Sequence, residues 1–337
     1  MKRGLQASAI LGALASGEAV SGQALAARFG VTRAAVWKQV AALRALGLPI
    51  AARTGAGYQL PWPTQLLDAG RIAAELGGAD AAPVQVHWAL DSTQDELARQ
   101  LPGAADLTVV LAEHQRLGRG RRGRGWLSPP GLGIHLSCLK HFATSPAALS
   151  GLSVAVGVCV VRALGDVGVT DLQLKWPNDV LAAGAKLAGT LIEVSGEYEG
   201  PCVARVGVGL NVRLPPALRA ELTQPAADLA ELCGGVPPDR NRLAARLIAQ
   251  LRVGLLRFEQ DGLAAFADDF ARLDALADQP LTVHGPQGAQ QGVGRGLDAR
   301  GALRVATDAG IIAVHSGEVS VRLGRGRGAP EVGRQAT

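Results

Sequence analysis

The sequence predicts an α/β protein of several domains: an N-terminal winged helix-turn-helix, a central α/β domain and a small C-terminal β-barrel. Three observations lead to this fold class. The first 60 residues read as short helices followed by a hairpin, the middle of the chain mixes strand-like and helix-like segments, and short strand-like runs separated by turn residues begin at Pro280. A length of 337 residues is enough for two or three domains.

The N-terminal segment has the pattern of three helices and a wing. We expect helices over Gln6–Ala15, Ser21–Phe29 and Arg33–Leu46, with Ser21 and Thr32 as N-caps and Gly30 as a left-handed C-cap. A hairpin follows over Ile50–Leu60, with glycines at its turn. Two short helices joined across a glycine turn are the helix-turn-helix layout.

Charge is concentrated in this segment. Residues 1–60 hold seven basic side chains and one acidic one, or +6, whereas the whole chain is +5, so the other 277 residues sum to −1. A small basic unit on a nearly neutral body indicates nucleic-acid binding. A helical dimerisation domain with a charged outer face remains an alternative. The side chains expected to reach DNA are Arg33, Trp37, Lys38, Gln39 and Arg53.

Cysteine usage and hydropathy exclude several classes. The four cysteines are far apart and form no C-x-x-C pair, which argues for reduced thiols and against a disulfide framework or a zinc site. The most apolar stretch, Ala147–Val161, is shorter than a membrane span, and no secretion leader is visible. We therefore expect a cytoplasmic protein with no membrane partner.

The start of the central domain contains a candidate binding element. After the proline-rich linker Pro61–Thr64 we expect an entry helix over Leu66–Leu76 and a strand over Val84–Leu90. Thr93 and Glu96 have the spacing of a capping box that opens a helix ending at Leu101. Capping alone explains these residues, but hydroxyls and free N–H groups at a helix start can also bind a polar ligand group.

The remaining elements follow from periodicity and turn residues. We expect strands over Gly133–Leu139, Asp171–Leu181 with a break at Pro177, Lys186–Val194 and Val203–Val212, and helices over Pro146–Leu164, Asn241–Phe258 and Leu263–Leu276. The expected domains are residues 1–62, 66–277 and 278–325, with a disordered tail over 326–337.

Four arginines and four glycines are packed into Gly118–Trp126. Glycine allows close backbone approach, and arginine offers a planar fork for carboxylate or phosphate. This segment, which we call the arginine loop, is therefore a candidate anion-binding loop. The first six residues match G-x-G-x-x-G, but Pro129 and Pro130 prevent a helix from following, which excludes a dinucleotide fingerprint. A solvated basic loop or a nucleic-acid patch is the alternative.

Three motifs occur in a specific order: Gly118–Gly123, Lys175–Asp179 and Lys186–Gly189, followed by Gly207–Asn211. From about residue 5 to 325 the chain resembles the bacterial biotin–protein ligase family in its bifunctional, DNA-binding form. The resemblance implies a mixed sheet in the central ligase domain and an SH3-like C-terminal barrel. It also implies formation of biotinyl-5′-adenylate from biotin and ATP with Mg²⁺, and transfer of biotin to a lysine of the biotin carboxyl carrier domain of a carboxylase. The adenylate-bound homodimer would repress transcription at operator DNA.

The resemblance also assigns roles to residues. Lys186 and Arg121 would be catalytic, and Asp179 is a possible Mg²⁺ ligand. The biotin-binding set would be Ser92, Thr93, Gln94, Gln115, Gly118, Arg119, Gly120, Arg121, Lys186, Gly189 and Gly207. The ATP-binding set would be Arg119, Arg121, Arg124, Trp126, Asn178, Asp179, Lys186 and Asn211.

Two rival functions differ in class or substrate. A biotin-sensing repressor that has lost ligation would not need Lys186 or the complete arginine loop. A lipoate–protein ligase would lack both that loop and the winged helix.

Overall fold

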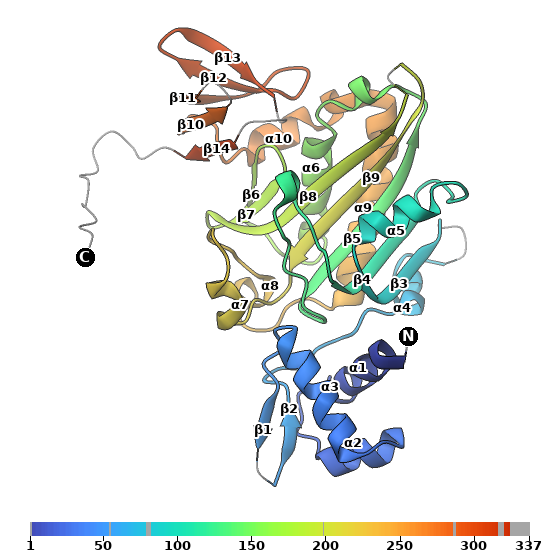
Figure 1. The fold of residues 1–337 in the computed structure, drawn as a ribbon. Coiled ribbons are helices and arrows are strands. Elements are labelled where there is room, and N and C mark those ends of the chain that lie inside the picture. Colours follow the sequence, from blue (N-terminus) through green and yellow to red (C-terminus); the bar gives the residue numbers. More distant parts are fainter. Residues whose placement is uncertain are drawn as a thin grey trace, which may run out of the picture.

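The computed structural model describes residues 2–53, 55–78, 82–197, 199–285, 288–315 and 320–323, without the side chains of 2–6 and 320–323. Three parts are stacked along one direction, with the N-terminal helices at one end, a large sheet in the middle and a small sheet at the other end (Figure 1). The expected tail, residues 326–337, lies outside the described residues.

The N-terminal part is a winged helix-turn-helix, as predicted. Its elements are α1 (Lys2–Ala13), α2 (Gly22–Phe29), α3 (Arg33–Ala45), β1 (Ala51–Arg53) and β2 (Gly57–Gln59). The side chains of Ser21 and Thr32 cap α2 and α3, and Gly30 ends α2 in the left-handed region at φ 62°. These elements close around a hydrophobic core of their own, built from residues between Ala7 and Leu60.

The central part is a seven-stranded mixed sheet with the order β3-β4-β5-β9-β8-β7-β6. The β3–β4 pair is parallel and every other neighbouring pair is antiparallel. The strands are β3 (Val84–Leu90), β4 (Val109–Gln115), β5 (Gly133–Phe142), β6 (Leu172–Lys175), β7 (Asp179–Ala182), β8 (Ala185–Gly196) and β9 (Cys202–Asn211). Helices α6 (Leu152–Gly165) and α9 (Arg240–Asp261) cover one face, while α5 (Thr93–Gln100) packs on the other (Figure 1).

Several expected helices differ in their limits: α1 begins four residues earlier and ends two earlier than expected, and α9 is longer at both ends. Three further differences have a visible cause. The entry helix begins at Ala69 rather than Leu66, because Asp68 caps α4 (Ala69–Glu75). The segment Pro146–Leu164 is a 3₁₀ turn over Pro146–Leu149 followed by α6, because Gly151 takes φ +83° between them. Likewise, Leu263–Leu276 divides into a 3₁₀ turn over Gly262–Phe266 and α10 (Ala267–Leu273).

The C-terminal part is a five-stranded antiparallel sheet with the order β13-β12-β11-β10-β14. Its strands are β10 (Pro280–Gly285), β11 (Gly288–Leu297), β12 (Leu303–Thr307), β13 (Gly310–Val314) and β14 (Ser320–Leu323). Within the described strands β13 and β14 do not pair, so the expected barrel is open. Unlike the N-terminal part, this sheet shares the core of the central domain, to which it adds Leu281 and Leu303 among others.

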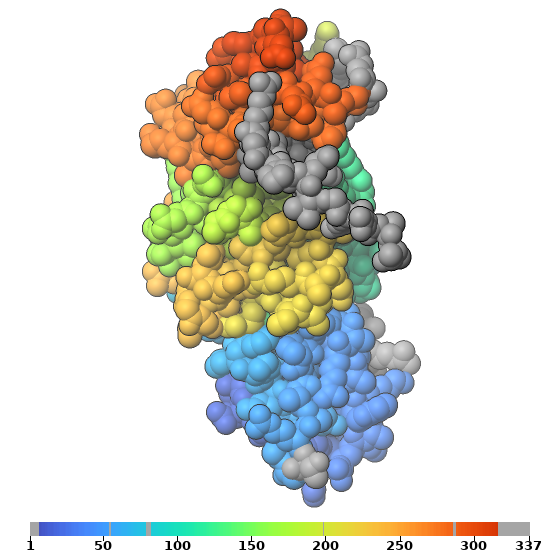
Figure 2. All heavy atoms as spheres, turned by 90° about the vertical axis from the view of Figure 1, so that its left-hand side faces the viewer, coloured from blue at the N-terminus to red at the C-terminus, as the bar shows by residue number. Residues whose placement is uncertain are grey.

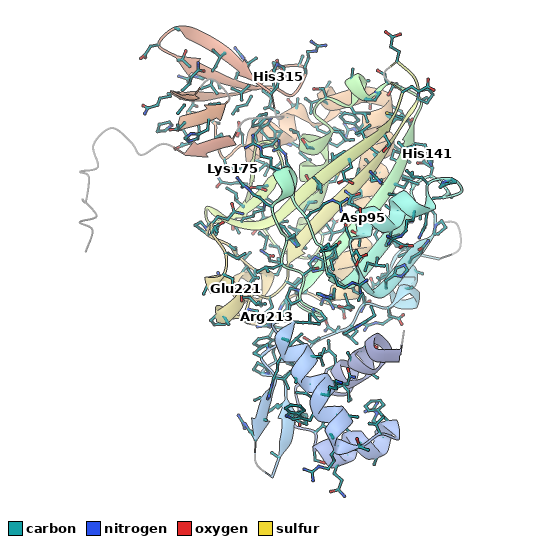
Figure 3. The ribbon with its side chains drawn as sticks, viewed as in Figure 1. Asp95, His141, Lys175, Arg213, Glu221 and His315 are labelled. Carbon is teal, nitrogen blue, oxygen red and sulfur yellow. The ribbon has the colours of Figure 1, made fainter. Side chains whose placement is uncertain are left out.

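Two short helices, α7 (Pro216–Ala220) and α8 (Leu229–Leu232), stand between the N-terminal domain and the central sheet. In the space-filling view their segment, drawn in yellow, rests directly on the blue N-terminal domain (Figure 2). Leu218 of α7 packs so closely on Gly47, just after α3, that a Cβ at Gly47 would lie 2.7 Å from its methyl carbon. The guanidinium of Arg213, labelled in Figure 3, stacks on Trp62 of the linker, with its central carbon 4.5 Å from the centre of the ring. Across the parts of the chain described, no helix is long and apolar enough to cross a membrane.

Candidate functional site

A pocket of about 660 Å³ lies on the open face of the central sheet. Nearly all residues assigned from the sequence motifs line it: Ser92, Thr93, Gln94, Gln115, Arg119, Gly120, Arg121, Arg124, Trp126, Asn178, Asp179, Lys186, Gly189, Gly207 and Asn211. The exception is Gly118, which lies at the root of the arginine loop, where a Cβ would come within 2.7 Å of the Trp126 carbonyl oxygen. Segments far apart in the sequence therefore meet at one site of a size typical of ligand pockets.

Glycines form the floor of the pocket. Gly189 of β8 pairs directly with Gly209 of β9, and Gly207 lies two residues earlier in β9. A Cβ at Gly209 would lie 2.5 Å from Trp126, and one at Gly207 would lie 2.7 Å from the Gln94 amide nitrogen. The missing side chains thus make room for groups that lie flat on the sheet.

The N-terminal turn of α5 forms one end of the pocket, and the expected capping arrangement there is wrong. Ser92, not Thr93, is the N-cap, and its side chain accepts a hydrogen bond from the backbone N–H of Gln94. Thr93 is the first helical residue, and its hydroxyl lies 2.7 Å from the Ser137 hydroxyl instead. One residue of difference directs the Thr93 side chain into the pocket.

Gln115 at the end of β4 completes this polar end. Its side-chain oxygen accepts the Thr93 backbone N–H at 2.8 Å and the Thr93 hydroxyl at 3.2 Å. The amide nitrogen of Gln115 is then the end that can donate to a ligand carbonyl. Gln94 has the opposite arrangement: its nitrogen donates to the carbonyls of Leu191 and Arg205, and its buried oxygen has no partner among the described residues. The pair offers both a donor and an acceptor to a small polar ligand.

The arginine loop is a tight hairpin with a 3₁₀ turn over Arg121–Gly123. The Gly120 amide donates to the Arg124 carbonyl at 2.7 Å, and the Trp126 amide donates to the Gly118 carbonyl at 2.8 Å. Arg122 has φ +59°, a region that a side chain other than glycine seldom adopts. The loop projects three arginines, at positions 121, 122 and 124, towards the pocket mouth.

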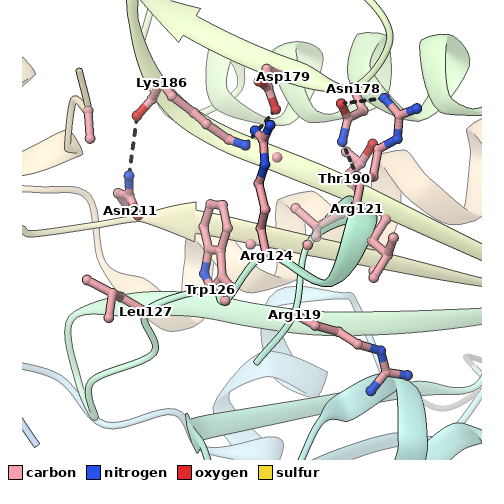
Figure 4. A pocket seen from close by; sticks show the side chains of 18 of the residues that line it. Arg119, Arg121, Arg124, Trp126, Leu127, Asn178, Asp179, Lys186, Thr190 and Asn211 are labelled. Carbon is pink, nitrogen blue, oxygen red and sulfur yellow. Dashed lines mark hydrogen bonds and ion pairs between the residues drawn. The ribbon is translucent and has the colours of Figure 1, made fainter. Parts of the chain in front are cut away.

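The Arg119 side chain is directed elsewhere. Its guanidinium makes a two-pronged pair with Asp95, at 2.8 and 2.7 Å, and also contacts the carboxylate of Glu193. These hydrogen bonds, with Asp95 the stronger partner, raise the pKa of Arg119 above its usual value. In Figure 4 Arg119 points away from the group formed by Lys186, Asp179 and Asn178. The structure therefore separates Arg119 from the other residues to which the sequence motifs assign phosphate.

Lys186 stands at the opposite end of the pocket. Its Nζ lies 2.7 Å from Asp179 Oδ1 and 5.3 Å from the centre of the Trp126 ring (Figure 4). Both members of the ion pair are about one-fifth exposed, so the ammonium is partly shielded from water. An ammonium between a carboxylate and an aromatic face is well placed to bind a phosphate oxygen.

Asn178 and Asn211 fix the surroundings of Lys186. Asn178 donates to the Thr190 carbonyl at 2.6 Å, and its side-chain oxygen lies 3.4 Å from a nitrogen of Arg121. Burial lowers the pKa of Arg121, which is half-buried beside them. Asn211 donates to the carbonyls of Lys186 and Ala227. Both asparagine side chains therefore donate to backbone carbonyls, and they fix the position of the chain around the pocket.

One wall of the pocket was missing from the sequence prediction. Leu222–Ala226, which follows α7, lies along Lys186: the Lys186 amide donates to the Pro225 carbonyl, and the Ala227 amide donates to the Lys186 carbonyl. The segment has no charged residue or recognisable motif that could have identified it. Gly209, Ser137, Thr190 and Lys175 also line the pocket without having been assigned to it.

The residues assigned to DNA lie in the N-terminal domain and do not line this pocket. Arg33, Lys38 and Arg53 are exposed, Trp37 is 63% exposed, and Gln39 is half-buried. Arg44, by contrast, donates to the Ile50 carbonyl and ties α3 to the wing. The exposed set therefore spans α3 and the wing strand β1.

Comparison with known proteins defines the class. Residues 7–59 match an HTH domain, residues 88–211 the biotin/lipoate A/B protein ligase family, and residues 278–322 the biotin protein ligase C-terminal domain. The fold resembles the biotin protein ligase of Aquifex aeolicus, solved in complex with biotin and ATP, with a TM-score of 0.61 and 27% identity over 72% of this chain and 99% of that one.

Whole-chain relatives define the family. The bifunctional ligase/repressor BirA of Escherichia coli is 36% identical over 93% of this chain and 96% of its own length. A biotin–[acetyl-CoA-carboxylase] ligase of Paracoccus denitrificans is 32% identical over 68% of this chain and 96% of its own length. The chain belongs to the bifunctional biotin–protein ligase/repressor family and is an enzyme of the biotin–[acetyl-CoA-carboxylase] ligase type.

Proposed function

We propose that this pocket joins biotin to ATP as biotinyl-5′-adenylate and then passes biotin to a lysine of a carboxylase carrier domain. The observation that carries the proposal is the position of Lys186, held by Asp179 above a glycine floor and opposite the arginine loop. The polar end at Thr93 and Gln115 matches the ureido ring of biotin, which has one carbonyl and two N–H groups.

Two anions must meet in the first step. The biotin carboxylate attacks the α-phosphorus of ATP, a new carbon-bound oxygen–phosphorus bond forms, and pyrophosphate leaves with the electron pair. Lys186, Arg121 and Arg124 supply positive charge where the two anions approach and where charge builds up on the leaving group. In the second step the acceptor amine attacks the biotinyl carbonyl, AMP leaves, and the amine loses a proton.

The pocket fits one Mg²⁺ ion that arrives with the nucleotide. Asp179 is the only carboxylate among the described residues that line it, and no group of three or more His, Cys, Asp or Glu residues gathers in the described chain. Mg²⁺ is usually bound by one or two carboxylates together with substrate phosphates, so this donor set is sufficient. Asp179 would hold the ion, which would neutralise phosphate charge.

The N-terminal domain supports a second activity on operator DNA. Its exposed face carries Arg33, Trp37 and Lys38 on α3 and Arg53 on the wing. We infer that the adenylate-bound protein forms a homodimer that reads an inverted repeat, since paired helix-turn-helix domains bind paired half-sites. All four cysteines are free, as expected of a protein that works in the reducing cytoplasm.

One experiment tests the ligase and separates it from its rivals. The purified protein is incubated with ATP, Mg²⁺ and either labelled biotin or labelled lipoate, and acid-quenched samples are searched for the acyl-adenylate and for labelled carrier domain. We expect adenylate and transfer with biotin only. Biotin binding without adenylate would indicate a repressor that has lost ligation, and transfer of lipoate would change the substrate.

A further inference from the structure

Arg119 attaches the arginine loop to two elements of the central domain. Its Nε donates to Glu193, one terminal nitrogen donates to Asp95, and the other donates to both carboxylates, at 2.7 to 3.2 Å. Asp95 lies in the first turn of α5, and Glu193 lies on β8. A single guanidinium thus joins two elements that are 98 positions apart in the chain.

Charge in this cluster is already balanced. Arg205, whose side chain is 13% exposed, lies 3.3 Å from Oε2 of Glu193, so two arginines face two carboxylates. The hydrogen bonds from Arg119 also hold the pKa of Asp95 below its usual range, so the carboxylate is charged at neutral pH. Four of the five N–H donors of Arg119 are used by these two carboxylates, so a substrate anion would have to displace a carboxylate to form a two-pronged pair with Arg119.

Because Arg119 lies at the base of the hairpin, its contacts with Asp95 and Glu193 hold the whole loop in place. Arg119 forms a β-bridge with Gly125, so both limbs of the hairpin are fixed where its side chain is fixed. Arg121, Arg122 and Arg124 are carried on the turn between them. The same first turn of α5 that bears Asp95 bears Ser92–Gln94 at the polar end of the pocket.

We propose that Asp95 is a positioning residue: with Glu193 it clamps Arg119, and this clamp keeps the arginine loop closed over the activated intermediate. Arg119 then serves as the anchor of the loop, and the anions are left to Arg121, Arg124 and Lys186. The inference rests on the proposed adenylate chemistry of the pocket. It assigns a role to Asp95 and Glu193, two acids that do not line the pocket.

The first test uses the ligand-free protein, because the clamp is present without substrate. Trypsin cuts after the loop arginines only when the loop opens. Asp95→Asn should speed this cleavage about fivefold, the scale of one partly exposed ion pair. The matched control is Glu96→Gln, which removes a similar pair with Arg99, 2.6 Å long, from the same helix without touching the loop. Equal cleavage of Asp95→Asn and the wild type would overturn the clamp.

The second test follows the enzyme-bound adenylate. Asp95→Asn and Glu193→Gln should each release it about fivefold faster than the wild type, with little change in melting temperature, and Asp95→Glu should restore retention. Asp95→Asn combined with Arg119→Gln should be no worse than Arg119→Gln alone, because both remove one interaction. Additive effects, or unchanged release, would overturn the positioning role. A wild type that forms no adenylate would overturn the proposed function, and trypsin would still decide on the clamp.

Discussion

Lys186 and Asp179 form an ion pair, 2.7 Å from Nζ to Oδ1, directly above Gly189. A Cβ on Gly189 would lie 2.9 Å from Lys186 Cε. The absence of a side chain at Gly189 therefore leaves room for the Lys186 side chain to reach Asp179. The register shift between Val180 and Leu181 brings Asp179 opposite Gly189 while Leu181 faces Lys186. The pair is therefore a product of strand register, and it fixes the position of the ammonium before substrate arrives.

Lys186→Ala should abolish most adenylate formation. If the ammonium stabilises charge developing on the phosphates, its loss should slow the reaction at least about 100-fold, the scale for one preorganised donor. Pyrophosphate exchange measures this step, with Lys175→Ala as the comparison because Lys175 also lines the pocket. A Lys186→Ala rate within a few-fold of the wild type, with a large loss in Lys175→Ala, would transfer the role to Lys175.

Gly209→Ala should weaken ATP binding. The added methyl carbon would lie 2.5 Å from Trp126, which must then leave the floor of the pocket. Overpacking of this kind costs about 1–3 kcal/mol, so we expect a Kd at least about fivefold higher by calorimetry. Gly125→Ala is the control, because a Cβ there meets nothing within 4 Å. If both variants bind ATP equally well, the floor does not determine nucleotide affinity.

Arg121→Ala should loosen the hold on the intermediate. Arg121 is half-buried beside Asn178, and loss of a hydrogen bond to a charged group costs about 1.5–3 kcal/mol, or at least about tenfold in adenylate release. Free adenylate would acylate unrelated proteins, so labelling of added serum albumin provides the assay. Arg122→Gly is the matched control, since Arg122 is exposed at φ +59°. Equal labelling by the two variants would exclude a specific role for Arg121.

Adjacent residues on α3 should separate DNA binding from stability. Trp37 is 63% exposed, so Trp37→Ala should change the free energy of unfolding by no more than about 0.5 kcal/mol. It should nevertheless weaken operator binding at least about fivefold if the indole contacts bases. Val36 is fully buried, so Val36→Ala should lower stability by about 1–3 kcal/mol. Footprinting and denaturant unfolding measure the two effects; intact operator affinity in Trp37→Ala would remove the indole from the interface.

His135 should make the protein sensitive to acid. Burial, with a smaller effect of Arg240, lowers the pKa of this histidine from 6.5 to about 3. Between these values the unfolded chain takes up a proton that the folded one does not, so stability falls as pH drops below about 6.5, by up to about 1.4 kcal/mol per pH unit. His135→Leu should flatten this slope, and because neither ring nitrogen has a partner among the described residues, it should not destabilise the protein at pH 7.

The control for His135 is His141→Leu, which changes an exposed histidine on the same strand. Denaturant midpoints between pH 4 and 7 provide the comparison. A slope in His135→Leu as steep as that of the wild type would assign the acid sensitivity to other groups.

Local signals predicted most of the fold. Ser21, Thr32 and Gly30 set the limits of α2 and α3, and each contact that decides them spans only a few residues. Helix α6 could not be bounded in this way. Gly151 takes its left-handed conformation where it packs against Leu263, more than a hundred positions further along the chain. The same reason explains Leu222–Ala226, whose place beside Lys186 depends on backbone hydrogen bonds to a distant strand.

The site was predicted as a set of residues but not as an arrangement. Motif identity indicated that Arg119 and Arg121 belong to one loop, two positions apart. The motif could not indicate that Arg119 would face Asp95 and Arg121 would face Asn178. These contacts depend on where α5 and the turn after β6 lie in space. Thr93 is a comparable case: the spacing to Glu96 suggested a cap, whereas the path of the chain out of β3 makes Ser92 the cap.

The N-terminal domain has its own hydrophobic core, whereas the central and C-terminal parts share one. This difference determines which part of the gene can be exchanged by recombination without exposing a core. The winged helix encloses its own core, and Leu66 and Trp88 from outside the domain rest against that core. The relative from Paracoccus denitrificans matches 68% of this chain while using 96% of its own length, so a biotin–[acetyl-CoA-carboxylase] ligase can be shorter than this chain. The C-terminal sheet has no such independence, because Leu281 and Leu303 complete the core beneath the catalytic sheet. Recombination near codon 62 would exchange one DNA-binding domain for another. A break near codon 278 would instead leave an exposed apolar surface on both products.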